Sequence, residues 1–145
     1  MGSATDVLGL RDMLLDESAR VVRAAHSQLL PVIKSIDSEL LFNSVANCKS
    51  PAGADAIFRL LVEKGRWASL SYLIRGSVHD DQSISTPSKT LMEYTFSQNR
   101  VFTQPSPDQR KQIQSAIDEC QSSMNEEFRR NVSSYMSSFG FTFSV

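Results

Sequence analysis

Apolar residues in the first part of the chain recur at intervals of three and four, with charged residues between them. This spacing is typical of amphipathic helices that bury one face. It predicts a long first helix over 10–29, a short apolar segment over 30–36, and a third helix that begins at Asp37 or Ser38. Pro31 lies in the short segment, where proline favours the first turn of a helix or a bend.

Two further helices have clear start and stop residues. Ser50-Pro51 predicts a helix start, because the serine hydroxyl accepts a hydrogen bond from a free backbone amide and proline suits the first helical position. Gly65 is expected to end this helix, and Gly76 to end a fifth helix that opens at Arg66. Five short helices joined by brief loops favour a compact orthogonal bundle.

The remainder of the chain has a different pattern. Residues 79–88 are polar and turn-rich, which predicts a linker. Alternating residues over 92–103 favour a β-hairpin. A long amphipathic helix with a capping box at its start is expected over about 107–138. The tail 139–145 alternates as a strand would, so it is expected to pack as a third strand beside the hairpin or against the first bundle.

These elements predict a mainly α protein with two units. Residues 1–78 form the bundle, 79–88 the linker, and 89–145 a smaller C-terminal unit. The C-terminal unit contains the long helix and either a β-hairpin or a three-stranded sheet. Neither an internal repeat nor a low-complexity segment interrupts the chain.

Composition restricts the classes of partner. The chain has 145 residues, 41% of them hydrophobic, and 15 Lys and Arg against 16 Asp and Glu, for a net charge of −1. Such a balance gives no general electrostatic reason to bind nucleic acid or an anionic membrane. No apolar leader or membrane span is recognisable, so we expect a cytoplasmic protein with another protein as its partner.

Candidate catalytic chemistry is sparse. Cys48 and Cys120 lie far apart without a Cys/His cluster, which favours neither a disulfide nor a zinc site. The triplet 79–81, His-Asp-Asp, resembles part of a metal phosphohydrolase site but lacks the further histidines, so a solvated turn is the better interpretation. No phosphate-binding glycine loop is present. We therefore expect no catalytic residues, metal, cofactor or small-molecule substrate, and no enzymatic activity.

The first half of the chain resembles a known family. The sequences SVANC over 44–48, SPAGADAIFRLLVEKG over 50–65 and WASLSYLIR over 67–75 carry the resemblance. Over about residues 10–78 they resemble a caspase-recruitment domain of the death-fold superfamily. The resemblance implies an adaptor module that associates homotypically in cell-death or innate-immune signalling.

The resemblance also implies where the partner binds. In that family, charged faces of the bundle meet, and charge complementarity sets the orientation and the encounter rate. The candidate acidic face is the start of the third helix, with Asp37 and Glu39. The candidate basic face comprises Arg20, Arg23, Arg59, Lys64 and Arg66. The alternative for each of these charges is that it only solvates the bundle.

Three other functions remain open at this stage. A helical regulator or inhibitor, viral or related to host defence, would bind a partner helix in an apolar groove walled by Phe58, Trp67 and Tyr72. An enzyme would need a polar pocket around residues 79–81. Nucleic-acid binding would need six basic residues to converge on one face. These six are Arg59, Lys64, Arg66, Arg75, Arg100 and Arg110.

Overall fold

The computed structural model describes residues 4–97 and 103–144, and these residues form eight α-helices and three short 3₁₀ segments. The helices are α1 (Ala4–Met13), α2 (Ala19–Leu29), α3 (Ser38–Ser44), α4 (Pro51–Glu63), α5 (Arg66–Ser77), α6 (Gln82–Ser97), α7 (Pro107–Cys120) and α8 (Glu126–Ser137). The 3₁₀ segments are Leu30–Ser35, Val45–Asn47 and Gln121–Ser123. The expectation of a mainly helical protein is confirmed.

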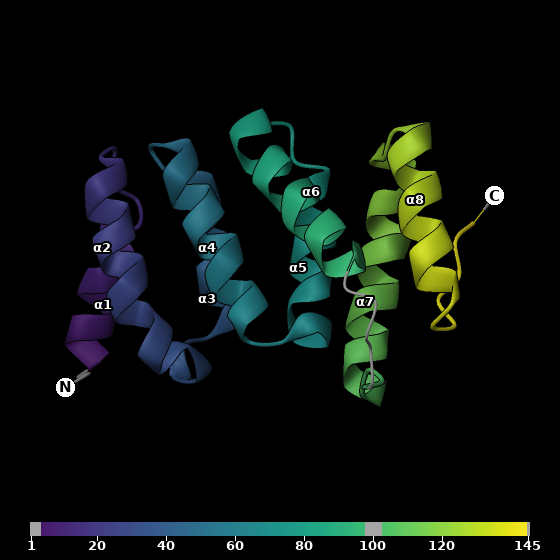
Figure 1. Ribbon diagram of the computed structural model, residues 1–145, viewed down its shortest axis with the longest axis horizontal. Coiled ribbons are helices and arrows are strands. Elements are labelled where there is room, and N and C mark those ends of the chain that lie inside the picture. Colours follow the sequence, from purple (N-terminus) through teal and green to yellow (C-terminus); the bar gives the residue numbers. More distant parts are fainter. Residues whose placement is uncertain (1–3, 98–102, 145) are drawn as a thin grey trace.

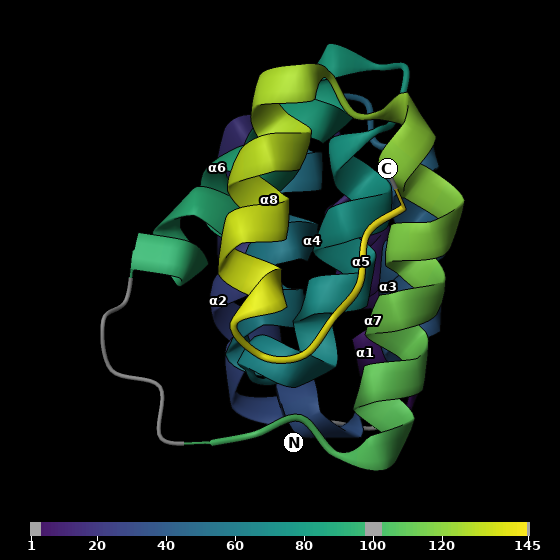
Figure 2. The same ribbon diagram turned by 90° about the vertical axis from the view of Figure 1, so that its right-hand side faces the viewer.

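The helices stand side by side in a row that begins with α1 and α2 and ends with α7 and α8 (Figure 1). Viewed along the row, α1, α3, α5 and α7 form one layer and α2, α4, α6 and α8 form the other (Figure 2). Within the layers α2 contacts α4, α4 contacts α6, and α5 contacts α7, while α5 and α6 pack across the layers. Each helix therefore contacts mainly its neighbours in the row.

One apolar core extends along the whole row. It includes side chains from Leu14, before α2, to Phe141, after α8. Phe58 in α4, Leu73 in α5 and Ile113 in α7 are fully buried within it. The core crosses the segment 79–88 without a break, while the division into units 1–78 and 89–145 stays a prediction.

The closest helix packing is at the centre of the row. A Cβ atom on Gly76 would lie 2.5 Å from the ring of Phe58 and 2.8 Å from the hydroxyl of Ser88. Ser88 is itself fully buried and donates a hydrogen bond to the backbone carbonyl of Leu73. Only a glycine in α5 and a small residue in α6 permit this approach, since the ring of Phe58 has no space to move into.

The predicted first helix over 10–29 is wrong in one respect, because the chain breaks it into α1 and α2. Asp16 accepts a hydrogen bond from the backbone amide of Ser18 at 2.8 Å. Ser18 in turn caps α2 by accepting from the amide of Val21. Aspartate and serine compete with the helix for backbone hydrogen bonds, and these local signals override the apolar spacing.

Helix α6 occupies 82–97, so most of the predicted turn-rich segment 79–88 and the first strand of the predicted hairpin 92–103 are helical instead. Residues 98–102 of that hairpin lie outside the described residues. The buried residues of α6 have helical spacing, but half of them are serine or threonine. Because these residue types are mostly exposed in proteins, the sequence pattern does not reveal a buried helical face here. These buried residues are Ile84, Ser85, Ser88, Leu91, Met92 and Thr95.

The predicted helix over about 107–138 consists of two helices. α7 ends at Cys120, and Asn125 caps α8 by accepting a hydrogen bond from the amide of Phe128 at 2.8 Å. The predicted capping box at the start of α7 is confirmed, with Ser106 and Gln109 bonded reciprocally. An asparagine cap followed by two glutamates is a strong helix start, and here it interrupts a continuous apolar stripe.

The predicted sheet is not formed by the residues that the structure describes, none of which is assigned to a strand. The tail nevertheless has the predicted two-residue alternation. Phe141 is buried and Phe139 and Phe143 are half-buried, whereas Gly140, Thr142 and Ser144 are exposed. The tail packs against α7 and α8 as an extended segment (Figure 2).

Candidate functional site

The outer surfaces of α2, α4 and α6, which we call the α2–α4–α6 face, contain two adjoining hollows. The first, of about 260 Å³, lies between α2 and α4. The second, of about 360 Å³, lies between α4 and α6. His26 and Arg59 line both hollows, and we call the two adjoining hollows together the groove. Its other lining residues are Val22, Arg23, Ala52, Asp55, Ala56, Val62, Glu63, Thr90, Leu91 and Tyr94.

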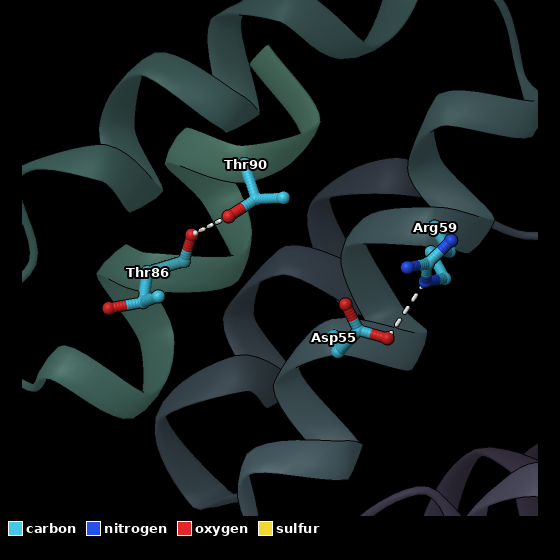
Figure 3. A network of polar contacts seen from close by, with 4 residues as sticks. All are labelled: Asp55, Arg59, Thr86 and Thr90. Atoms are coloured by element: carbon cyan, nitrogen blue, oxygen red, sulfur yellow. Dashed lines mark hydrogen bonds and ion pairs between the residues drawn. The ribbon is translucent and has the colours of Figure 1, made fainter. Parts of the chain in front are cut away.

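An ion pair lies on the α4 side of the groove. Arg59 Nε and Asp55 Oδ2 are 2.8 Å apart, one helical turn from each other, and about half of each side chain is exposed (Figure 3). Thr86 and Thr90 lie on the neighbouring helix α6, where the Thr90 hydroxyl donates to the Thr86 carbonyl at 3.0 Å (Figure 3). An exposed pair of this kind contributes only about 0.3–0.5 kcal/mol. A carboxylate from a partner can therefore compete for Arg59.

His26 lies where the two hollows meet. Burial lowers its pKa below the ordinary value of 6.5, and Arg59 lowers the pKa further, whereas Asp55 and Glu63 act in the opposite direction. Its Nε2 atom is buried and has no hydrogen-bond partner among the described residues. The imidazole is thus neutral at neutral pH. It lines the groove with its ring, while its buried Nε2 atom makes no hydrogen bond to the described residues.

Two predicted basic residues extend the face along α2. Arg20 and Arg23 are exposed, and neither has an acidic partner within 4.0 Å in the described parts of the chain. Arg23 lines the first hollow together with Arg59. Two of the five predicted basic residues, Arg23 and Arg59, therefore line one hollow, while Arg20 is exposed on α2 outside it.

The other two basic residues hold the fold together. Lys64 donates a hydrogen bond to the backbone carbonyl of Ile36, and burial lowers its pKa. Arg66 donates to the hydroxyl of Tyr135 in α8. Neither lines the groove, because the ends of α4 and α5 direct them toward neighbouring loops and helices.

The predicted acidic residues lie in the other layer, at the start of α3. Asp37 is exposed and caps α3 by accepting a hydrogen bond from the amide of Glu39 at 2.8 Å. Glu39 lies 4.0 Å from Arg75. Burial, followed by the interaction with Glu39, raises the pKa of Tyr72 to about 12. Asp37 and Glu39 thus lie in the layer of α3, whereas Arg20, Arg23 and Arg59 lie on α2 and α4 in the opposite layer (Figure 2).

The triplet 79–81 forms a turn before α6. The amide of Asp81 donates to His79 Nδ1 at 3.0 Å, and Asp81 accepts from the amide and hydroxyl of Ser83, which lower its pKa. All three residues of the triplet are exposed. The described residues contain no group of three His, Cys, Asp or Glu side chains that would hold a metal ion.

The aromatic residues of the predicted apolar groove lie in the interior. Phe58 is fully buried and Trp67 is 6% exposed. The Trp67 ring packs edge-on against Phe139 at 4.8 Å, and its Nε1 donates to the hydroxyl of Thr103 at 3.1 Å. Tyr72 is half-buried and packs on Phe42. These side chains pack within the core that the described residues form.

The two thiols have no reactive character. Burial raises the pKa of Cys48 to about 11. Burial also raises the pKa of Cys120, and the neighbouring Glu119 adds to that effect. Both side chains are therefore protonated at neutral pH, which disfavours nucleophilic and metal-binding roles.

Sequence reasoning missed the contribution of α6 to the groove. Tyr94, which is 61% exposed, falls in the predicted hairpin over 92–103, and Thr90 lies between that hairpin and the predicted linker over 79–88. The helical spacing of Ile84, Leu91 and Met92 was the available signal, and it places Thr90 and Tyr94 together on the opposite side of the helix.

Comparisons with known proteins add no relative. The chain has no significant match to a protein-family model, a curated protein or a solved structure. The resemblance to a caspase-recruitment domain therefore stays a prediction. Within the described ranges, none of the helices has the length and apolar character needed to cross a bilayer.

Proposed function

We propose that this chain is a non-enzymatic protein-interaction module that binds its partner through the α2–α4–α6 face. The observation that carries the proposal is the groove, two adjoining hollows that lie along three helices. It is lined by two arginines, a neutral histidine and an exposed tyrosine. Arginine and tyrosine are among the residues that contribute most to protein interfaces.

The arrangement of the helices supports the same function. Rows of helix pairs, in which each pair contacts its neighbours, present one helix of each pair on a long common face. Proteins built in this way use the extended face to bind other proteins. In this chain α2, α4 and α6 provide such a face (Figure 1).

The partner that best fits the charges is a second copy of the chain. Arg20 and Arg23 are exposed in one layer, and Asp37 and Glu39 are exposed at the start of α3 in the other. Association of the basic face of one copy with the acidic end of α3 of the next would be heterologous, since the two surfaces differ. Such an interface generates closed rings or open filaments. This is the homotypic association that the family resemblance implies.

Light scattering coupled to size-exclusion chromatography tests the proposal. We expect the mean mass to rise with protein concentration in about 50 mM salt and to fall in about 500 mM salt, where surface charges are screened. Arg23→Glu is expected to weaken association about tenfold, because it places a like charge opposite the acidic residues. The matched control is Lys111→Glu, which makes the same charge change at an exposed position on α7.

Two results would contradict homotypic binding. One is a monomer at every concentration and both salt concentrations. The other is equal weakening by Arg23→Glu and Lys111→Glu, which would indicate that net charge and not the α2–α4–α6 face controls association.

A further inference from the structure

The extended segment 139–144 is held in a groove between α7 and α8 (Figure 2). Phe141 is 4% exposed, while Phe139 and Phe143 are half-buried on the same side of the segment. Arg110 lies over the ring of Phe141 at 5.4 Å from its centroid. The segment thus presents alternate aromatic side chains to the helices, as a β-strand presents one face to a core.

Side chains of the helices bind the backbone of this segment. The Gln114 amide donates to the Thr142 carbonyl at 2.8 Å and accepts from the Thr142 amide at 3.1 Å. Gln121 accepts from the Ser144 amide at 2.8 Å, and Arg129 donates to the Ser144 carbonyl. Residues 142 and 144, two apart, therefore each have both backbone groups satisfied. This is the pattern that a neighbouring β-strand would supply, here supplied by side chains.

The segment is joined to α8 by one sharp turn. Arg110 donates to the carbonyl of Phe139 at 2.8 Å, and Gly140 has a φ of +90°, a conformation that favours glycine. At the other end an open pocket of about 580 Å³ adjoins Ser144. Met124, Arg129 and Phe143 are among the residues that line it. The segment is therefore joined to α8 by a sharp turn at one end, and the groove that holds it is open at the other end.

We infer that the α7–α8 groove is a binding site for an extended peptide of a partner protein, and that segment 139–144 is its resident ligand. The resident segment defines the chemistry of the peptide. The peptide has aromatic side chains at alternate positions, with small or polar residues between them. Its backbone carries a free N–H group opposite Gln114, as Thr142 does. Recognition of the backbone fixes the extended conformation, and the aromatic positions provide selectivity. A partner's peptide binds by displacing the segment. This site is separate from the α2–α4–α6 face and does not depend on the function proposed above.

A peptide-binding experiment with the full chain tests the inference. The probe is a fluorescent peptide with the sequence of residues 139–144, and its affinity is measured by fluorescence anisotropy. The unaltered chain is expected to bind it weakly, because its own segment competes. Phe141→Ser removes the best-buried anchor of the resident segment and is expected to tighten peptide binding about tenfold or more. Adding Gln114→Ala to that chain is expected to reverse the gain, whereas adding Gln112→Ala, at an exposed position of the same helix, is not.

Altered peptides separate backbone recognition from nonspecific adhesion of aromatic groups. A methyl group on the amide that corresponds to Thr142 removes the donor that Gln114 accepts. This change is expected to weaken binding about tenfold. Methylation of the amide that corresponds to Phe143, which makes no hydrogen bond to the described residues, is the matched control and should have little effect. Equal affinity of the two methylated peptides would overturn the inference.

Hydrogen exchange is measured on the unaltered chain, so its result does not depend on whether a substituted chain folds. The amides of Thr142 and Ser144 are expected to exchange at least about tenfold faster than those of the α5 core, by local opening of the segment. Exchange of these amides only with global unfolding would overturn the inference, because a segment that never opens cannot be displaced. A dimer of the unaltered chain that the peptide dissociates would assign the groove to a second copy and overturn the claim of a separate partner.

Discussion

The centre of the row and its C-terminal end are held together by different interactions. At the centre, α4, α5 and α6 meet through fully buried residues, and Phe58, Gly76 and Ser88 leave no space between them. At the C-terminal end, partly exposed side chains such as Gln114 bind the backbone of an extended segment. Burial produces a fixed structure, whereas water can replace hydrogen bonds of exposed groups at little net cost. We therefore expect the centre to be rigid and the C-terminal segment to open locally.

The largest expected effect concerns the centre. Phe58→Ala should lower the free energy of unfolding by about 3–5 kcal/mol, since it removes a fully buried ring. Gly76→Ala should lower it by about 1–3 kcal/mol, because its Cβ would collide with that ring. In the double variant the collision with the ring is gone and only the close contact with the Ser88 hydroxyl remains, so Gly76→Ala should be clearly less destabilising there. Urea unfolding of the four chains measures this coupling, and additive effects would show that the Phe58 contact does not govern the packing.

A smaller effect is expected at the C-terminal end. Gln114→Ala removes two hydrogen bonds to Thr142 from a partly exposed position and should lower the free energy of unfolding by about 1 kcal/mol. Gln112→Ala, exposed on the same helix, is the control for helix propensity. Thermal unfolding compares the two variants. A loss as large as that from Phe58→Ala would remove the contrast between the two regions.

The stability of the chain should also depend on pH through His26, which lies on α2 beside the groove. The pKa of His26 is lowered in the folded chain, mainly by burial, so the unfolded chain binds a proton more readily. The contribution of His26 is thus complete above its unfolded pKa of 6.5 and is lost as the pH falls from there toward the folded pKa. Urea unfolding at about pH 7.5 and about pH 5.5 should show a smaller decrease in His26→Gln than in the unaltered chain.

The smallest effect on stability is expected on the α2–α4–α6 face itself. Asp55→Asn removes an exposed ion pair and should change the free energy of unfolding by no more than about 0.5 kcal/mol. It also leaves Arg59 without its partner on α4, so association with an acidic surface should strengthen. Thermal unfolding and light scattering on one sample measure the two effects. Unchanged association would show that Arg59 does not contact the partner.

The elements that the sequence predicts correctly are those with apolar buried faces and strong caps. Ser50 and Pro51 begin α4, Gly65 precedes α5, and Ser106 begins α7, all as expected. Helix α6 escaped prediction because Ser85, Ser88 and Thr95 occupy half of its buried face, where only their packing reveals them. The breaks at Ser18 and Asn125 depend on single side-chain caps within continuous apolar stripes, which spacing alone does not detect.

The candidate site was predictable in part. Arg23 and Arg59 line one hollow because helical spacing places them on the facing outer sides of α2 and α4, and Arg20 is exposed on α2 outside that hollow. Lys64 and Arg66 do not join them, because each donates to a group brought close only by the tertiary fold, the Ile36 carbonyl and the Tyr135 hydroxyl. Hydrogen bonds between residues so distant in sequence leave no local pattern, so charge alone could not distinguish binding residues from structural ones.

The central claim is that the basic part of the α2–α4–α6 face binds the acidic start of α3 of a second copy. Sedimentation equilibrium of Arg23→Glu, Glu39→Arg and the double variant tests it most directly. Each single reversal should weaken self-association about tenfold, and the double reversal should restore a measurable part of it. Independent effects without any restoration, in chains whose circular dichroism shows them folded, would contradict the claim.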